Sequence, residues 1–209
     1  MEDLAIVFNT TDKYSNIWKA WYHYFKKYWT LDLPMYFLNE KLDCPFPFKQ
    51  IKVDVQGVGL WTKKLRESVK QIPENNLFIL LDDLFFIDGF REGEFEMMYQ
   101  YFLDINADAL RMRPNTGIAV RIPSKTPRFG RLAPNSPYLI SWQPNIWKKK
   151  TLLECIKVDE NPWKNEQIGT KRIRSRKFNI HYCEKDEWYV NVLRHGRVDP
   201  NHRHLLKIK

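Results

Sequence analysis

The feature that most constrains this sequence is an apolar run, Leu77–Leu81, that follows the turn residues Pro73–Asn76. A short, uninterrupted apolar run bounded by turn residues is typical of a strand buried on both faces. Two acids, Asp82 and Asp83, come directly after it. Open α/β sheets bind ligands at the carboxyl ends of such strands. The run therefore predicts the central strand of an α/β sheet, with a candidate site at its end.

Strand and helix patterns alternate along the rest of the chain, as α/β folds require. With 209 residues, of which 44% are hydrophobic, we expect one domain over residues 1–209. The other predicted strands are 4–8, 34–38, 51–55, 108–112 and 117–121, and residues 138–144 are predicted to form a strand that leads into a turn. The predicted helices follow Ser15 and cover 61–72, 92–105 and 146–158, and residues 123–137 are predicted to form a long loop. Aromatic residues recur at helical spacing after Ser15, so we expect that face to be mostly core.

The chain is basic, with a formal net charge of +9 that is concentrated in 148–150, 171–177 and 194–209. Such charge favours a nucleic acid, an anionic membrane surface or a phosphorylated small molecule as partner. No recognition-helix or aromatic RNA-binding pattern accompanies it, so we expect no specific nucleic-acid partner. Binding of a diphosphate and peripheral membrane contact through the basic segments both stay open, as does a merely solvated surface.

The sequence has no apolar stretch near the ~20 residues that span a bilayer, and its first residues are acidic instead of forming a basic, apolar leader. We therefore expect a cytoplasmic protein, with the inner face of a membrane as an alternative location. The three cysteines lack CxxC spacing, which argues against a zinc site or a disulfide framework.

The best candidate for a general base is Glu166, in the segment Asn161–Glu166, which sets a carboxylate beside the aromatic Trp163. The alternative is an exposed acid at a helix end. The acidic pair Asp82 and Asp83 also has two interpretations. Adjacent carboxylates repel, so they suit a site where a divalent cation, a ribose hydroxyl or a basic side chain compensates them. Alternatively, they are a helix cap or loop acids.

An ordered set of short motifs runs through nearly the whole chain: TDKYS after the first strand, LWTKKL at 60–65, DDLFF at 82–86, SWQPNIWKK at 141–149, NPWKNE at 161–166 and YVN ahead of Gly196. Together they resemble the small bacterial and viral glycosyltransferases of capsule and surface-polysaccharide clusters. The resemblance implies an α/β, GT-A-like nucleotide-diphospho-sugar transferase fold, with a mixed, mainly parallel central sheet flanked by helices. It also implies a nucleotide-binding half at about 1–90 and an acceptor or catalytic half at about 91–209.

The resemblance further implies a donor, an acceptor and roles for individual residues. The donor is a nucleotide-sugar, most simply a UDP-sugar, and the acceptor is a glycan or another hydroxyl compound. Glu166 matches the base of inverting members. The donor-binding residues are expected to be Asn9, Thr10, Thr11, Asp12, Tyr14, Trp61, Lys64, Asp82 and Asp83. For two of these an alternative stays open, namely that Trp61 is core and Lys64 is exposed.

The sequence departs from the family pattern at Leu84, which occupies the third place of a DxD motif that normally holds an acid. Asp83 is therefore the single expected ligand for Mn²⁺ or Mg²⁺, with further ligands available from His195, His202 and His204. Without a metal, the basic segment Lys171–Arg176 is expected to stabilise the departing nucleoside diphosphate.

Two other classes of function stay open. One is a nucleotide-sugar or polyanion binding protein of the same architecture without turnover. The other is a nucleic-acid-binding accessory protein, which rests on the charge alone. A Rossmann dehydrogenase is unsupported, because the glycines form no GxGxxG pattern.

Overall fold

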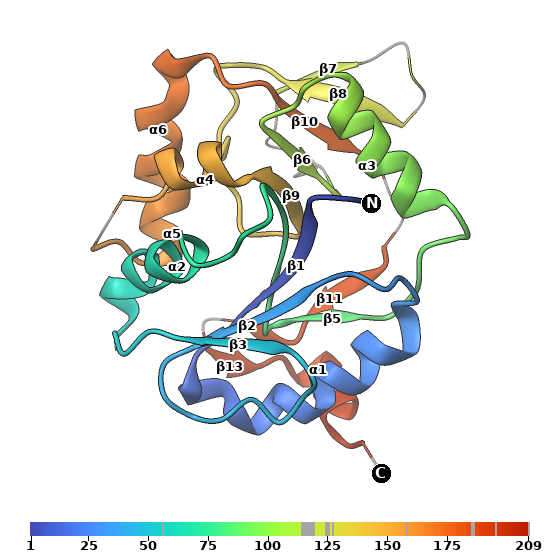
Figure 1. Cartoon of the computed structure of the whole chain (residues 1–209), viewed down its shortest axis with the longest axis vertical. Coiled ribbons are helices and arrows are strands. Elements are labelled where there is room, and N and C mark those ends of the chain that lie inside the picture. Colours follow the sequence, from blue (N-terminus) through green and yellow to red (C-terminus); the bar gives the residue numbers. More distant parts are fainter. Residues whose placement is uncertain are drawn as a thin grey trace.

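The computed structural model describes residues 1–55, 57–113, 120–123, 126, 128–157, 159–184, 187–194 and 196–208. Within these residues, a nine-stranded sheet runs through the molecule in the order β3-β2-β1-β4-β9-β6-β10-β8-β7 (Figure 1). Its strands are β1 (Leu4–Asn9), β2 (Met35–Asn39), β3 (Lys49–Lys52), β4 (Asn76–Leu81), β6 (Ala109–Arg111), β7 (Arg121–Pro123), β8 (Phe129–Leu132), β9 (Asn145–Lys148) and β10 (Ile180–Cys183).

The strand directions confirm the expected mixed, mainly parallel sheet. Strands β3, β2, β1 and β4 are parallel neighbours, and β10 is parallel to β6. Strand β9 is antiparallel to both β4 and β6, and β8 is antiparallel to both β10 and β7. All strands of this sheet except β8 and β9 therefore point the same way, and their carboxyl ends lie along one edge.

Helices cover both faces of the sheet because alternate residues of the buried strands point to opposite sides. In β1, Leu4, Ile6 and Phe8 join one hydrophobic core, whereas Ala5 and Val7 join the other. Helices α1 (Ser15–Tyr28) and α3 (Glu94–Asp104) contribute to the first core. The second core takes side chains from α2 (Trp61–Val69), α4 (Lys149–Cys155) and α6 (Thr170–Ile173), which share one side of the molecule in Figure 1.

The aromatic face of α1 is core, as expected. Trp18, Trp21 and Phe25 are buried, and the ring of Trp21 stacks on Phe8 with centroids 3.7 Å apart. The Trp21 indole Nε1 donates a hydrogen bond to the carbonyl of Leu84 at 3.0 Å. The helix therefore packs on the sheet and also fixes the chain directly after the acidic pair.

The last part of the chain returns to the end of β4. Strand β5 (Leu84–Phe86) pairs with β11 (Tyr189–Asn191), and β12 (Leu193–Arg194) pairs with β13 (Arg197–Val198). A 3₁₀ helix, Pro200–Leu206, follows and packs near α1. Since β5 begins one residue after Asp83, this arrangement brings the residues around 191–196 to the same edge of the sheet.

Two predicted elements around residue 145 were wrong. Residues 138–144 form turns and bends instead of a strand, with Tyr138 at a φ of +53° and an Asn145 side chain that donates to the Ser141 carbonyl at 2.7 Å. The predicted helix at 146–158 covers only Lys149–Cys155, because residues 145–148 pair with β4 and β6 as strand β9. Apolar residues of the loop, such as Ile140, are buried by tertiary packing, which explains the misleading pattern.

Several other boundaries differ from the predictions. The helix expected at 61–72 ends at Val69, and the third strand is Lys49–Lys52 instead of 51–55. The expected loop at 123–137 contains strand β8, which pairs with β10. The strand predicted at 117–121 lies largely outside the described residues. No helix in the described part of the chain is both long and apolar enough to cross a membrane.

Candidate active site

A pocket of about 860 Å³ lies at the carboxyl edge of β1, β2 and β4. Its lining includes every residue predicted to bind the donor: Asn9, Thr10, Thr11, Asp12, Tyr14, Trp61, Lys64, Asp82 and Asp83. These residues come from the loop after β1, from α2 and from the end of β4. The structure therefore brings the predicted set together, because parallel neighbouring strands end at the same edge.

Asp12 joins the loop after β1 to the loop after β2. Its Oδ1 accepts a hydrogen bond from Asn39 Nδ2 at 2.7 Å, and its Oδ2 accepts from the backbone N–H groups of Lys41 at 2.8 Å and Leu42 at 3.1 Å. Burial raises the pKa of Asp12, but these hydrogen bonds outweigh burial and lower the pKa overall. Both carboxylate oxygens thus shape the pocket wall.

Lys64 is buried with only 1% of its side chain exposed, so it belongs to the pocket and is not a surface residue. Its Nζ lies 3.0 Å from Glu40 Oε1 and donates to the carbonyl of Thr10. The other oxygen of Glu40 accepts from the backbone N–H of Asp12 at 2.6 Å. Burial lowers the pKa of Lys64, while Glu40 opposes this change. The buried pair holds α2 against the loops of β1 and β2.

Trp61 combines both roles considered for it. Its side chain is largely buried in the core, and it also lines the pocket. Its ring meets that of Trp142 edge to face, with centroids 4.6 Å apart. The core position therefore fixes the orientation of an indole that faces the pocket.

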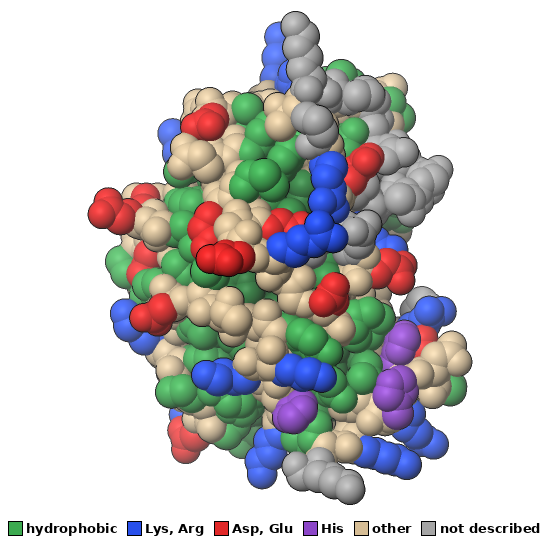
Figure 2. Space-filling model, turned by 90° about the vertical axis from the view of Figure 1, so that its right-hand side faces the viewer, with side chains coloured by type: hydrophobic (Ala, Val, Ile, Leu, Met, Phe, Trp, Pro, Cys, Tyr) green, Lys and Arg blue, Asp and Glu red, His purple; other side chains and the backbone are tan. Residues whose placement is uncertain are grey.

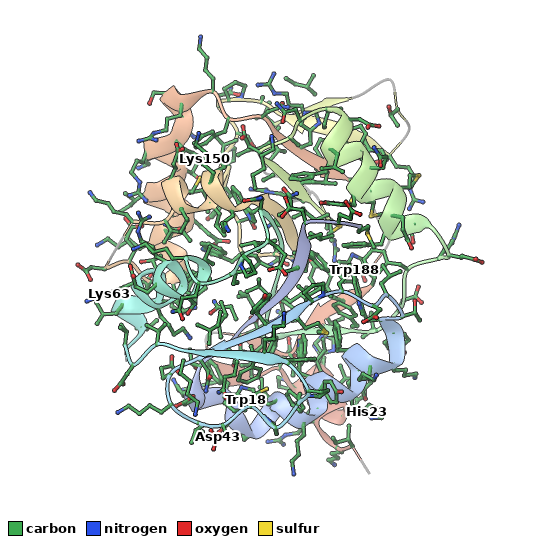
Figure 3. All side chains as sticks on the ribbon, viewed as in Figure 1. Trp18, His23, Asp43, Lys63, Lys150 and Trp188 are labelled. Atoms are coloured by element: carbon green, nitrogen blue, oxygen red, sulfur yellow. The ribbon has the colours of Figure 1, made fainter. Side chains whose placement is uncertain are left out.

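Asp82 is held in a relay of hydrogen bonds that begins on α1. The indole Nε1 of Trp18, labelled in Figure 3, donates to Thr10 Oγ1 at 2.7 Å, and this hydroxyl donates to Asp82 Oδ2 at 2.5 Å. Burial raises the pKa of Asp82 to about 6, and the Thr10 hydrogen bond and Lys64 limit the rise. A side chain held in this way is oriented before any ligand arrives.

Asp83 is placed differently from its neighbour. Its Oδ1 is buried and has no hydrogen-bond partner in the described part of the protein. Burial, with the charge of Asp82 adding to it, raises the pKa of Asp83 to about 7. The carboxylate therefore lacks a protein group that would stabilise its charged form fully, which is the condition expected of a group that meets a cation or a ligand hydrogen.

Glu166 lies on a π-helical segment, Asn165–Gly169, between the short helix α5 (Pro162–Lys164) and α6. Its Oε1 accepts a hydrogen bond from the backbone N–H of Trp142 at 2.8 Å. Burial raises the pKa of Glu166, whereas this hydrogen bond and the charge of Arg111 lower it. Its charge also raises the pKa of Asp83, so the two carboxylates share one electrostatic environment.

The residues that surround this carboxylate pair are themselves buried polar groups. Arg111, at the end of β6, donates through Nη2 to the carbonyl of Tyr138, while its buried Nη1 has no partner among the described residues. Burial lowers its pKa to about 10. Tyr189 Oη donates to Gln143 Oε1 at 2.7 Å, and burial raises its pKa to about 12. The charge of Arg111 thus acts on Glu166, and the charges of Asp83 and Arg111 act on Tyr189.

Two sequence neighbours of Glu166, Trp163 and Gly169, have roles other than enclosing its carboxylate. Trp163 is 55% exposed at the rim of the pocket, so it is not the apolar wall that raises the pKa of Glu166. Gly169 has helical backbone angles and makes no tight bend. Its role is close packing, because a Cβ there would stand 2.7 Å from Ile140 Cδ1.

The basic segment Lys171–Arg176 does not line the pocket, contrary to the sequence-based expectation. Arg172 pairs with Glu160 at 2.8 Å, and Arg176 pairs with Glu154 at 2.8 Å. On the face in Figure 2, Lys and Arg side chains are likewise spread out, with acidic side chains among them. The cationic residues that line the pocket are instead Lys13, Lys64 and Arg194.

A divalent cation would find few protein ligands here. No group of three or more His, Cys, Asp or Glu side chains suited to a metal occurs among the described residues. His202 and His204 do not line the pocket, and His195 lies outside the described residues. The unpartnered Oδ1 of Asp83 still fits a single carboxylate ligand, with a diphosphate supplying further oxygens.

Sequence reasoning missed several pocket residues, including Glu40, Gln143, Asn191 and Arg194. Glu40 was detectable, since it follows β2 at the same edge of the sheet as Asn9. Gln143 and Asn191 belong to the motifs SWQPNIWKK and YVN, and Arg194 begins the basic segment 194–209, but none of these patterns indicates a place in the pocket. Only the pairing of β9 with β4 and of β11 with β5 brings them to the pocket.

Solved structures of similar fold support this architecture. S. aureus TarS 1–349 in complex with UDP-GlcNAc matches with a TM-score of 0.63 and 12% identity over 99% of this chain and 61% of that chain. TarS 1–349 in complex with UDP matches with a TM-score of 0.60 and 13% identity over 89% and 59%, respectively. The chain thus spans less than two thirds of these TarS chains.

A third match is the CMP:2-keto-3-deoxy-manno-octonic acid synthetase complexed with CTP, with a TM-score of 0.53 and 14% identity over 90% of this chain and 92% of that one. No protein-family model matches the chain, and no curated protein matches it by sequence. At these identities the likeness establishes the fold, and the chain has the GT-A-like fold that these proteins share.

Proposed function

We propose that this chain is an inverting glycosyltransferase that moves a sugar from a UDP-sugar to a hydroxyl group of a glycan or similar acceptor. One observation carries the proposal: all nine residues predicted to bind the donor, Asp83 among them, line a single pocket. Glu166 is half-buried and does not itself line this pocket, but its charge acts on Asp83. The GT-A-like fold supports it, because TarS, which is similar in fold, was solved with UDP-GlcNAc.

The reaction would be an in-line displacement at the anomeric carbon. Glu166 accepts the proton of the acceptor hydroxyl while the acceptor oxygen bonds to the anomeric carbon. The bond from that carbon to the diphosphate breaks, and UDP leaves with the electron pair. The Trp142 N–H holds the Glu166 carboxylate in place, and burial keeps its pKa above that of an ordinary glutamate, which favours proton uptake.

A metal would act at the diphosphate. Asp83 is the residue that would hold Mn²⁺ or Mg²⁺, and the cation would neutralise charge on the leaving group. Asp82 is committed to Thr10 and would orient the site instead of binding the ion directly. The wider assignment, a single glycosyltransferase domain that acts in capsule or surface-polysaccharide synthesis at the inner face of a membrane, remains part of this proposal.

A two-step assay tests the proposal. UDP-, GDP- and dTDP-sugars, each with and without Mn²⁺, are first screened by thermal shift, since a ligand at ~100 times its dissociation constant stabilises a fold by ~2.7 kcal/mol. Release of the nucleoside diphosphate is then measured with candidate acceptors. UDP-sugar binding with acceptor-dependent UDP release is expected. Binding without release under any acceptor would favour a non-catalytic nucleotide-sugar binding protein.

A second candidate activity is nucleotidyl transfer to a sugar or sugar phosphate. It is favoured by the match to the CMP-sugar synthetase, which covers almost the whole of both chains, although its TM-score is lower than that of TarS. The two activities release different products. A nucleotidyltransferase forms pyrophosphate from a nucleoside triphosphate, whereas a glycosyltransferase forms a nucleoside diphosphate from a nucleotide-sugar.

A further inference from the structure

The hairpin formed by β12 and β13 is attached directly to the acidic pair of the pocket. The backbone N–H of Val192 donates to the carbonyl of Asp83 at 2.7 Å, and the N–H of Asp199 donates to the carbonyl of Val192 at 2.8 Å. Leu193, Arg194 and Gly196 line the pocket. The base of the hairpin is therefore fixed where a donor diphosphate would meet Asp83.

Arg194 is held at one end of its guanidinium group. Its Nε lies 2.6 Å from Asp199 Oδ2, and the side chain of Arg194 is 71% exposed while that of Asp199 is only 4% exposed. The Asp199 carboxylate is itself fixed, because Oδ1 accepts from the backbone N–H of Asn201 at 3.0 Å. The two terminal nitrogens of Arg194 make no hydrogen bond to any described residue, so its donors remain available to a ligand in the pocket.

The pocket lining is rich in carboxylates, so binding of an anionic diphosphate there requires a cationic group with free donors. Among the described residues, four carboxylates line the pocket, those of Asp12, Glu40, Asp82 and Asp83. Lys64 is occupied by Glu40 and by the Thr10 carbonyl. A nucleoside diphosphate adds further negative charge, and the remaining cations in the lining are Lys13 and Arg194. Of these, only Arg194 is pre-oriented by a buried carboxylate, and guanidinium groups match phosphate oxygens in geometry.

We propose that Arg194 binds the diphosphate of the donor and stabilises the negative charge that builds on the leaving group, with Asp199 as the positioning residue. This inference rests on the nucleotide-sugar function proposed above. The guanidinium group donates hydrogen bonds to non-bridging phosphate oxygens and keeps its protons throughout, so it acts only through charge and hydrogen bonding. It takes the role that the sequence suggested for the segment 171–176.

The test compares binding of UDP with binding of uridine, which lacks the diphosphate, by calorimetry on the full chain. Arg194→Ala is expected to weaken UDP binding by roughly 10- to 100-fold, as for the loss of a charged hydrogen bond, and to leave uridine binding unchanged. Arg194→Lys should restore part of the UDP affinity. Asp199→Asn should lower UDP affinity by a few fold without changing that of uridine.

Arg197→Ala is the matched control, because Arg197 pairs with Arg194 across the hairpin but is exposed and does not line the pocket. Its UDP affinity should equal that of the parent. Equal losses of UDP and uridine binding in Arg194→Ala and Arg194→Lys would indicate a structural role and overturn the proposal, as would unchanged UDP binding in Arg194→Ala. A parent chain that binds neither compound would overturn the nucleotide function itself, and this inference with it.

Discussion

The loop side and the acidic side of the site differ in how many of their polar atoms have hydrogen-bond partners. On the loop side, Asp12, Asn39, Glu40 and Lys64 bond to one another and to the backbone, and both carboxylates have partners on both oxygens. The acidic side consists of Asp83, which lines the pocket, together with Arg111, Glu166 and Tyr189, which are not part of the lining. Here Asp83 Oδ1 and Arg111 Nη1 are buried without partners among the described residues.

The loop side is a hydrogen-bonded structural network, called the frame below, whereas the acidic side contains polar atoms without hydrogen-bond partners among the described residues. A network whose members are all bonded resists rearrangement and fixes the shape of the pocket. Buried carboxylates with raised pKa and unused atoms are costly to maintain, and such groups cluster at functional sites. We therefore expect substitutions on the loop side to act on stability and those on the acidic side to act on turnover.

The largest expected effect is that of Asp83→Asn, which should abolish turnover. It should not lower stability at pH 8, because the pKa of Asp83 is raised from 3.8 to about 7 and its ionised form is therefore disfavoured in the folded protein. The folded state binds more protons than the unfolded state between these values, so this group lowers stability as pH rises through that window. Turnover assays with urea unfolding at pH 5 and pH 8 measure both quantities. A variant that unfolds more readily at pH 8 would make Asp83 part of the frame.

Glu166→Gln should lower turnover by ~10²- to 10⁴-fold, the usual loss when general-base assistance is removed, with donor binding nearly unchanged. The parent rate should rise with pH as the carboxylate ionises, and this dependence should disappear in the variant. Glu154→Gln, which changes an exposed acid outside the pocket, is the control. Turnover within a few fold of the parent would exclude Glu166 as the base and favour a retaining mechanism.

On the loop side, Lys64→Met should lower the free energy of unfolding by about 3–5 kcal/mol, because it leaves the Glu40 carboxylate buried and unpaired. Lys63→Met is the matched control. Figure 3 shows Lys63 on the outer side of α2, so we expect a change within about 0.5 kcal/mol. Denaturant unfolding measures both. Recovery of part of the loss in the double variant with Glu40→Gln would identify the pair as the cause, whereas a loss unchanged by the second substitution would contradict it.

The smallest expected effect is that of Trp163→Ala at the rim, between the two sides. Because the indole is half-exposed, stability should change by at most about 0.5 kcal/mol, while an aromatic face at the pocket mouth suits a sugar ring. We expect a rise of a few fold in the KM for the acceptor and a kcat close to that of the parent. Ile168→Ala removes a similarly exposed apolar side chain outside the pocket and should change neither constant.

Much of the frame was predictable, because it depends on local patterns. The apolar runs of β1 and β4 indicate strands buried on both faces, and the polar residues that follow them must emerge at the edge where parallel strands end. The same rule applied to β2 would have found Glu40. It failed at residues 138–144, where an apolar run is buried in a loop that pairs with no strand.

Charge runs were the least informative pattern. The segment 171–176 contains four basic residues, yet Arg172 and Arg176 are paired with acids outside the pocket. Arg194, which begins the basic segment 194–209, lines the pocket. The number of basic residues in a segment does not indicate where their side chains point in the folded protein.

The sequence by itself determined the parallel strands β1, β2 and β4 and the acids at the end of β4, because burial patterns are set by neighbours a few residues apart. Only the tertiary structure decided which of those acids is satisfied and which is left free. The partner of Glu166 is a backbone N–H 24 residues away, and Asp83 meets the hairpin of Arg194 through strand pairing between β5 and β11. Contacts at such separations depend on how the elements pack together, and no local pattern records that packing.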